Sequence, residues 1–235
     1  MIADFHSHIL PGMDDGSGDI PESLKMLRME AEQGIGTVIA TPHFYARYDT
    51  PETFLENRAE AERKLREAMA SVPDLPEIRM GAEVHYFPGM SESEFLPLLT
   101  IENSDYLLLE LPMSPWPDSM YREMAAIYER QGIIPIIAHV DRYIAPFRTH
   151  GIPRRLAELP VLVQANAGFF LNCSTAAMAL RLLKNEKIHL LGSDCHNLAD
   201  RPPKLGAAVK KIRQKLPEDV LSWIAEYQNR VLICP

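Results

Sequence analysis

The chain has 235 residues, of which 46% are hydrophobic, and it carries a formal net charge of −8. This length and apolar content suit a single core, and we predict one domain that spans residues 1–235. The negative charge argues against a nucleic-acid-binding protein, because such proteins neutralise many phosphates with lysine and arginine. Any anionic ligand must instead be held by a local pocket.

Targeting signals are not evident in the sequence. No stretch is long and apolar enough to span a bilayer, and no basic segment followed by an apolar one opens the chain. We therefore expect neither a secretory signal nor membrane insertion. Three cysteines, Cys173, Cys195 and Cys234, form too sparse and odd a set for a disulfide framework. These features predict a cytoplasmic protein.

Apolar runs typical of strands alternate with amphipathic segments along the chain. The predicted strands cover residues 2–5, 37–40, 78–82, 106–109, 133–138, 161–165 and 188–191. The predicted helices cover residues 21–33, about 51–70, 119–130, 174–184 and 203–216. Pro51 follows a capping residue, which is typical of a helix start, and Gly34 is typical of a helix end. Residues 86–102 and 112–117 are expected to form loops.

Alternation of helices with strands that are apolar throughout indicates a mostly parallel sheet covered on both faces. Seven predicted strands favour a closed or nearly closed barrel over an open doubly wound sheet. The glycines after the first strand lack the strand-turn-helix context of a dinucleotide site. We predict an α/β fold, a distorted TIM-like (β/α)7 barrel.

A histidine or carboxylate follows directly after most of the predicted strands. Burying such a group is costly unless a partner such as a metal ion offsets the cost. His6 and His8 are one residue apart on an extended segment, so their side chains point to the same side and can share a cation. The candidate metal ligands are His6, His8, Asp15, His43, Glu83, Glu110, His139, Asp194 and His196.

Nine ligands of mixed type are too many for one ion and suit two or three divalent ions. Imidazole nitrogens suit Mn²⁺, Fe and Zn²⁺, and carboxylates can bridge adjacent ions. We expect Mn²⁺, with Fe or Zn²⁺ as alternatives. The bridging role falls most naturally to Glu83 or Asp194.

Several motifs carry these residues in order along the chain. They are Asp4-x-His6-x-His8, Pro11-Gly12-x-Asp14-Asp15-Gly16, Thr41-Pro42-His43, Gly81-Ala82-Glu83, Leu109-Glu110-Leu111-Pro112, His139-Val140-Asp141-Arg142-Tyr143, Ser193-Asp194-x-His196-Asn197 and Arg201-Pro202-Pro203. Together they resemble the polymerase-and-histidinol-phosphatase (PHP) superfamily, and within it the bacterial manganese-dependent protein-tyrosine phosphatases of capsule and exopolysaccharide loci.

This resemblance implies a PHP-type distorted barrel and a trinuclear metal site that hydrolyses phosphate monoesters. By motif, the family's metal ligands fall on the nine residues above, and its phosphate-contacting arginines fall on Arg142 and Arg201. The expected chemistry is attack by metal-activated hydroxide on phosphorus. Arginine can bind the phosphoryl oxygens at two points.

The expected function is that of a protein-tyrosine phosphatase, with a bacterial tyrosine kinase of polysaccharide export as the phosphotyrosine-containing partner. The alternative is a histidinol-phosphatase-like enzyme or another small-molecule phosphatase. Loop residues above the barrel could form an apolar wall for a phenyl ring. These are Tyr86, Phe87, Pro88, Pro112, Pro115, Trp116 and Pro117, which could instead merely pack the loops onto the barrel.

Three other classes are disfavoured. Cys195 and Arg201 have the spacing of cysteine-dependent phosphatases, but the loop between them lacks glycines, and Asp194 and Asp200 would repel a thiolate and the substrate. An amidohydrolase commonly needs a lysine at a strand end, and none follows a predicted strand here. A metal-stabilised binding module without turnover would not explain two arginines beside the site.

Some residues keep open interpretations. Asp14 is expected to be a turn residue rather than a ligand, and Asn197 is expected to orient a ligand. Glu110 could cap a helix or pair with a lysine, and Arg142 could pair with an acidic neighbour such as Asp141. His85 is left unassigned.

Overall fold

The computed structural model of the protein describes residues 2–144 and 151–233, so Cys234 lies outside the described residues. The strands are β1 (Ile2–Ser7), β2 (Ile35–Ala40), β3 (His43–Phe44), β4 (Glu77–Met80), β5 (Glu83–His85), β6 (Tyr106–Glu110), β7 (Ile134–Ile137), β8 (Leu162–Asn166) and β9 (Leu190–Gly192). Each predicted strand is found, with ends that differ by a few residues. The additional short strands β3 and β5 were not predicted.

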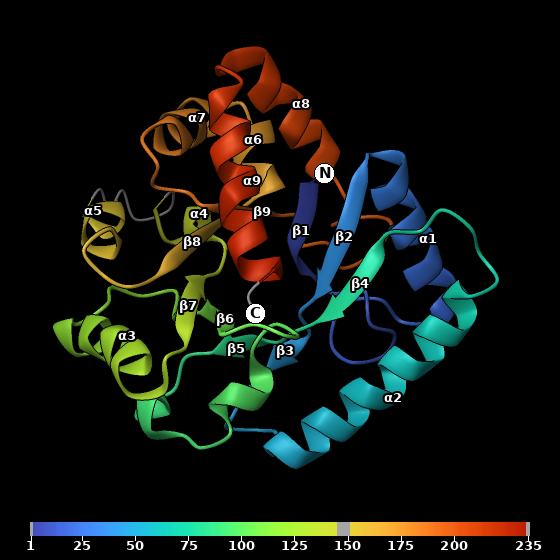
Figure 1. Cartoon of the computed structure of the whole chain (residues 1–235), viewed down its shortest axis with the longest axis horizontal. Helices are drawn as coiled ribbons and strands as arrows, with labels where there is room; N and C mark the ends of the chain where they lie inside the picture. The colour runs from blue at the N-terminus through green and yellow to red at the C-terminus, as the bar shows by residue number, and fades with distance from the viewer. Residues whose placement is uncertain (1, 145–150, 234–235) are drawn as a thin grey trace.

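The strands form a ring of parallel pairs (Figure 1). One sheet has the order β1-β2-β4 and the other the order β3-β5-β6-β7-β8-β9. The pairing of β2 with β4 continues into that of β3 with β5, because Gly81 N donates to Ala40 O at 2.9 Å and Glu83 N donates to Pro42 O at 3.0 Å. Two strands are therefore interrupted rather than added.

The ring closes where β1 meets the segment that follows β9. Asp194 N donates to His6 O at 2.8 Å, and His8 N donates to Cys195 O at 2.9 Å. This closure confirms the predicted distorted barrel, and it brings the two ends of the motif series into contact.

The helices are α1 (Ile20–Glu32), α2 (Pro51–Met69), α3 (Asp118–Gln131), α4 (Val140–Ile144), α5 (Ile152–Leu156), α6 (Ala167–Leu171), α7 (Ala176–Lys184), α8 (Leu205–Lys215) and α9 (Asp219–Leu232). The five predicted helices correspond to α1, α2, α3, α7 and α8, and the others were not predicted. Thr50 caps α2 by accepting a hydrogen bond from Thr53 N, as the capping pattern indicated. Within the described residues, no helix has the length and apolar character needed to cross a membrane.

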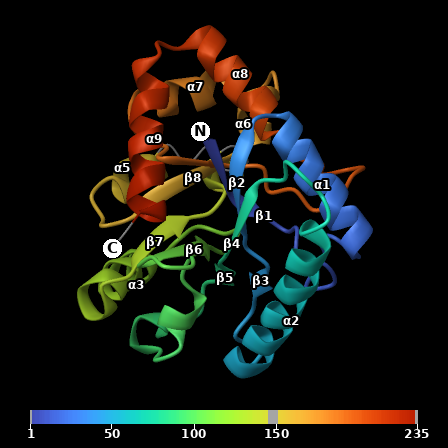
Figure 2. The ribbon, with the colours of Figure 1, turned by 45° about the vertical axis from the view of Figure 1, so that its right-hand side comes forward.

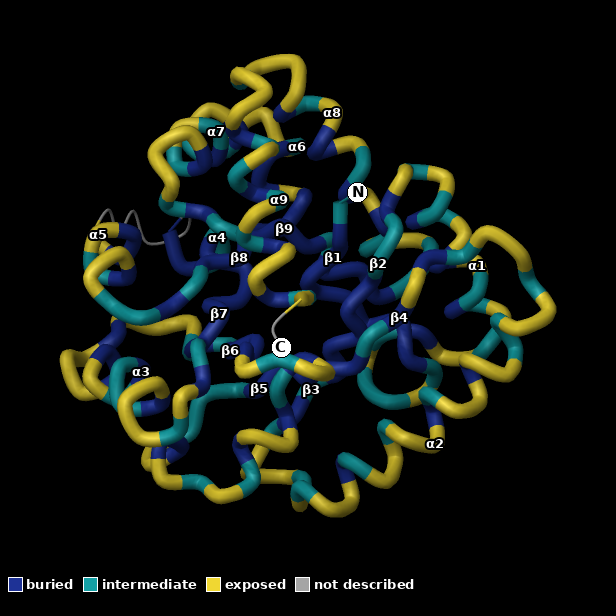
Figure 3. Tube along the Cα trace, viewed as in Figure 1, coloured by how far each residue is buried: buried dark blue, intermediate teal, exposed yellow. Residues whose placement is uncertain are grey.

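Two apolar clusters hold the strands and helices together. The smaller one fills the inside of the ring with residues from alternate strand positions, among them Phe5, Ile39, Leu108, Ile136 and Leu190. The larger one lies between the ring and the surrounding helices. Figure 3 shows the resulting pattern, with buried positions on the central strands and exposed positions on the outer faces of the helices.

Helix α9 stands at one side of the ring, next to β8 in Figure 2, and packs against β1 and β9. Its Val231 joins the smaller cluster. Its buried Gln228 receives a hydrogen bond from Ala3 N at 3.3 Å and donates one to Ala3 O at 3.4 Å. The spacing of Val220, Ile224 and Val231 is typical of an amphipathic helix and could have predicted it.

Gly192 marks the tightest approach between β9 and β1. A Cβ atom at this position would lie 2.6 Å from His6 Cβ and 2.6 Å from Gln164 Nε2. We therefore expect Gly192→Ala to lower the free energy of unfolding by about 1–3 kcal/mol, since overpacking of a tight interior costs that much.

Urea denaturation would measure this change. Gly168→Ala in α6 is the matched control, because a Cβ there meets no atom within 4 Å. Equal stabilities of the two variants would contradict the close packing of His6 against β9.

Candidate metal centre

All nine candidate ligands lie at one rim of the ring, at or just after the carboxyl ends of its strands. His6 lies near the end of β1 and His8 follows that strand. His43 and Glu83 come shortly after β2 and β4, at the first positions of the short strands β3 and β5. Glu110 ends β6, His139 follows β7, and Asp194 and His196 follow β9. Asp15 comes from the loop between β1 and α1. The rim is where parallel barrels place reactive side chains.

Glu83 lies at the middle of the group, buried among imidazole rings. Its Oε2 is 3.1 Å from His6 Nε2, 3.4 Å from His8 Nε2 and 3.0 Å from His43 Nδ1. Its Oε1 is 2.8 Å from His139 Nε2. One carboxylate thus faces the imidazole nitrogens of four histidines, as a bridging ligand would.

Asp194 is the second central carboxylate. Its Oδ1 is 3.5 Å from His6 Nε2 and 3.6 Å from His8 Nε2. Arg142 pairs with Oδ2, and Arg201 pairs with Oδ1 at 2.5 Å. Of the acidic partners considered for Arg142, the structure shows another rim acid, Asp194, rather than Asp141. Both arginines therefore stand directly beside the ligand group.

The remaining ligand candidates complete two flanks of the centre. On one flank, Asp15 Oδ1 is 3.4 Å from both His43 Nε2 and His196 Nε2, although its side chain is 68% exposed. On the other flank, Glu110 Oε1 is 3.4 Å from His139 Nε2. Glu110 neither caps a helix nor pairs with a lysine among the described residues, so those interpretations are wrong.

The donor set fits divalent ions. Ligand atoms of His8, Asp15, His43 and His196 lie within 4.8 Å of one another, and so do those of His6, His8 and Asp194, and those of His43, Glu83 and Glu110. The ring nitrogens His6 Nε2 and His8 Nε2 face each other at 3.1 Å.

Several buried nitrogen and oxygen atoms of the candidate ligands have no hydrogen-bond partner within the described residues, among them His43 Nδ1, Glu83 Oε2 and His196 Nε2. Buried polar atoms are nearly always satisfied, and a cation would satisfy these.

The two central carboxylates are held in the charged form that binds metal. Burial opposes ionisation of Glu83, but the charge of His6 and the close approach of the His139 and His43 imidazoles outweigh it and lower its pKa well below the usual range. Burial likewise opposes ionisation of Asp194, and the charges of His6 and Arg142 outweigh it and lower its pKa. Charged, desolvated oxygens therefore face the imidazoles.

Neighbouring polar side chains orient two of the ligand candidates, His8 and Glu110. Asp14 Oδ2 lies 2.7 Å from His8 Nδ1, which directs His8 Nε2 into the centre. Asp14 Oδ1 also accepts a bond from Gly16 N at 2.9 Å. The prediction of a turn residue was therefore correct but incomplete. His85 Nδ1 lies 3.0 Å from Glu110 Oε2 and orients that carboxylate in the same way.

Asp4 joins the two segments that carry the outermost motifs. Its Oδ1 accepts hydrogen bonds from His6 N at 3.1 Å and from Ser193 N at 2.8 Å. The strand register of β1 is irregular between Asp4 and Ser7, which explains why His6 N is free to bond a side chain. One carboxylate oxygen thus sets the spacing between His6 and the segment of Asp194.

Two ligand candidates hold unusual backbone conformations. His139 has φ 30° and Asp194 has φ 54°, a left-handed region that costs free energy for residues other than glycine. The His139 N–H donates to Gln164 Oε1 at 2.6 Å, and Asp194 Oδ2 accepts from Asn166 Nδ2 at 2.7 Å. The surrounding bonds therefore hold both residues in place.

The environment of Cys195 excludes the cysteine-dependent mechanism. The thiol is fully buried, and burial together with the neighbouring Asp4 and Glu30 carboxyl groups raises its pKa well above the usual range. A reactive cysteine needs the opposite environment.

Asn197, expected to orient a ligand, instead accepts hydrogen bonds from Ala199 N, Asp200 N and Arg201 N. It shapes the loop that carries Arg201.

The predicted aromatic wall is mostly packed. Trp116 is only 8% exposed, donates its indole N–H to Pro112 O at 3.0 Å, and stacks edge-on against Tyr143 with ring centroids 4.8 Å apart. Tyr143 in turn stands between Trp116 and His139. Phe87 stacks on Phe95. Trp116 and Phe87 therefore mainly close the loops onto the barrel.

Known proteins share this architecture and sequence. The chain is 32% identical over 209 residues to the tyrosine-protein phosphatase YwqE of Bacillus subtilis (strain 168), covering 85% of this chain and 79% of that protein. It is 31% identical over 224 residues to the tyrosine-protein phosphatase CpsB of Streptococcus pneumoniae, covering 91% and 90%.

A solved structure from work on YwqE of Bacillus subtilis and CpsB of Streptococcus pneumoniae, described as metal-dependent tyrosine phosphatases, superposes with a TM-score of 0.86. The identity is 26%, and the match covers 99% of this chain and 94% of that one. The model of the family described as capsular polysaccharide synthesis, CpsB/CapC, matches residues 2–233. The chain belongs to the CpsB/CapC family.

Proposed function

We propose that this protein is a metal-dependent phosphatase that hydrolyses phosphotyrosine in proteins. The observation that carries the proposal is the convergence of nine metal-ligand candidates and two arginines at one rim of the barrel. The relatives named above are called tyrosine-protein phosphatases, which favours this substrate over histidinol phosphate or another small phosphomonoester.

Two to three divalent ions would be held by His6, His8, Asp15, His43, Glu83, Glu110, His139, Asp194 and His196. The mixture of imidazoles and carboxylates suits Mn²⁺ best, with Fe or Zn²⁺ next. Such ions would supply a water activated for attack on phosphorus and would offset the charge of the phosphoryl group.

Arg142 and Arg201 contribute the phosphate contacts. Their shared partner Asp194 fixes both guanidinium groups at the edge of the ligand group. Each planar guanidinium still has donors that Asp194 does not engage, and these match the geometry of phosphoryl oxygens. The arginines thus hold the substrate phosphate against the metal ligands while the P–O bond to the tyrosine oxygen breaks.

The physiological partner we propose is a bacterial tyrosine kinase of polysaccharide export, since the family is described by capsular polysaccharide synthesis. The whole described chain forms one closed ring with its helices, which fits a single catalytic unit.

Metal removal is the first test. Dialysis against a chelator should abolish hydrolysis of a phosphotyrosine peptide, and Mn²⁺ should restore it better than Mg²⁺, because imidazole ligands disfavour the harder ion. Full activity in protein shown to be metal-free by elemental analysis would end the proposal.

The nucleophile is tested by comparing substitutions at Cys195 and His43. Cys195→Ala should keep most of the activity, whereas His43→Ala should lose it by orders of magnitude, since His43 groups with His8, Asp15 and His196 at the rim and Cys195 does not. The measurement is kcat at saturating Mn²⁺, with metal content checked. A folded, metal-loaded Cys195→Ala protein without activity would make the metal mechanism wrong.

The arginines are tested by substitution at each position. Arg201→Ala or Arg142→Ala should cost about 2–3 kcal/mol of transition-state stabilisation, and lysine should restore little because it cannot make a planar two-point contact. Arg63→Ala on the exposed face of α2 is the control. If only thermal stability changes and kcat/KM does not, the arginines are structural ion-pair partners.

A further inference from the structure

The chain that leaves β3 forms a short turn at the mouth of the metal centre. Phe44 is fully buried, and the next residue, Tyr45, turns the chain. Its carbonyl oxygen accepts hydrogen bonds from Tyr48 N at 2.8 Å and from Asp49 N at 3.0 Å. Thr50 then caps α2. Residues 45–48, called here the tyrosine turn, are therefore fixed between a strand and a helix.

The ring of Tyr45 belongs to the edge of the centre. Its centroid lies 5.3 Å from that of His43 and 5.3 Å from that of His85. His43 is a ligand candidate, and His85 orients Glu110. Tyr45 is half-buried, so one part of its ring packs against these histidines and another part remains accessible.

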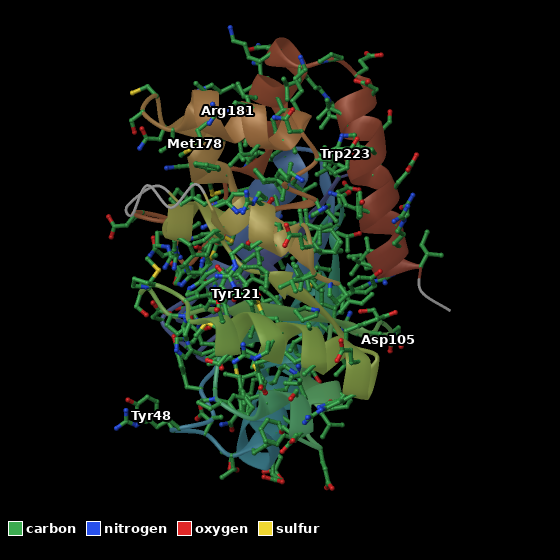
Figure 4. All side chains as sticks on the ribbon, turned by 90° about the vertical axis from the view of Figure 1, so that its left-hand side faces the viewer. Tyr48, Asp105, Tyr121, Met178, Arg181 and Trp223 are labelled. Atoms are coloured by element: carbon green, nitrogen blue, oxygen red, sulfur yellow. The ribbon has the colours of Figure 1, made fainter. Side chains whose placement is uncertain are left out.

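Tyr48 extends this aromatic surface away from the centre. Its ring lies 6.4 Å from that of Tyr45 in an edge-on arrangement, and its side chain is 77% exposed. Figure 4 shows it protruding from the side of the molecule opposite Trp223 of α9. A single exposed aromatic residue is ordinary. This one differs because it continues, ring to ring, into a ligand candidate.

Arg47 gives the turn a positive charge. Its guanidinium lies 5.6 Å from the centroid of the Tyr48 ring, and the side chain is exposed. Among the described residues, no ion pair involves Arg47. A free cation at the mouth of a site in a protein of net charge −8 favours a ligand with local negative charge.

We propose that the tyrosine turn binds the peptide segment next to the phosphotyrosine of the substrate, and that it prefers acidic residues there. The inference rests on the proposed function. Tyr45 lies beside the bound phosphotyrosine, the exposed ring of Tyr48 packs against the adjoining residue, and Arg47 pairs with an acidic side chain. Because the turn is already ordered, little conformational entropy is lost when the peptide binds.

The experiment measures kcat/KM of the Mn²⁺-loaded protein for three substrates: free phosphotyrosine, an acidic phosphotyrosine peptide, and the same peptide with neutral flanking residues. Tyr48→Ala should lower the ratio of the acidic-peptide value to the free-phosphotyrosine value by about threefold to tenfold, the range expected for loss of an aromatic contact. Tyr48→Phe should retain the ratio.

Arg47→Glu should lower kcat/KM for the acidic peptide more than for the neutral peptide. In the unsubstituted protein, added salt should reduce the ratio of the acidic-peptide value to the neutral-peptide value. Tyr128→Ala is the control, because Tyr128 is an exposed tyrosine on α3 and makes no contact with the tyrosine turn. It should leave two kcat/KM ratios unchanged, that of the acidic peptide to free phosphotyrosine and that of the acidic to the neutral peptide.

The outcomes separate the two proposals. If the protein hydrolyses all three substrates but Tyr48→Ala and Arg47→Glu leave both ratios unchanged, the docking role is wrong and the phosphatase proposal stands. If free phosphotyrosine and the peptides are not hydrolysed by Mn²⁺-loaded protein, the proposed function fails and the docking role fails with it.

Discussion

The structure depends on the burial of one carboxylate, that of Glu83, among four imidazole rings. The rings come from three separate segments, since His6 and His8 share one, and the nitrogen-to-oxygen distances lie between 2.8 and 3.4 Å. So much desolvated charge is tolerable only if the partners are held in a fixed arrangement. The parallel strands supply that arrangement, because their carboxyl ends meet at one rim, and the closure of β1 onto the segment after β9 completes it.

The convergence of the candidate ligands could be predicted from the sequence because it depends on where each residue stands relative to its own strand. Each of Glu110, His139 and Asp194 follows an apolar run, and the carboxyl ends of parallel strands converge whatever the loops do. The barrel itself followed from the same alternation. Ring closure was the one step that required a long-range contact, and the number of strands alone predicted it.

Other features depended on contacts that the sequence does not announce. The second role of Asp14 and the role of His85 appear only when the turn and the neighbouring strand bring them to His8 and Glu110. Trp116 looked available because it lies in a proline-rich loop, yet its indole N–H and its ring are both engaged. Tyr45 was overlooked because a lone tyrosine after a strand carries no pattern, and its position beside two histidines is tertiary.

The hydrogen bond that Ser193 N donates to Asp4 also bears on how the chain folds during synthesis. Its two residues are 189 positions apart, so His6 and His8 leave the ribosome long before their partners Asp194 and His196 exist. Until then the early histidines belong to an open chain edge rather than a closed ring, and contacts of such long range form slowly. A nascent or truncated chain would carry only part of the candidate ligand set, so the proposed metal centre can be complete only when translation is nearly complete.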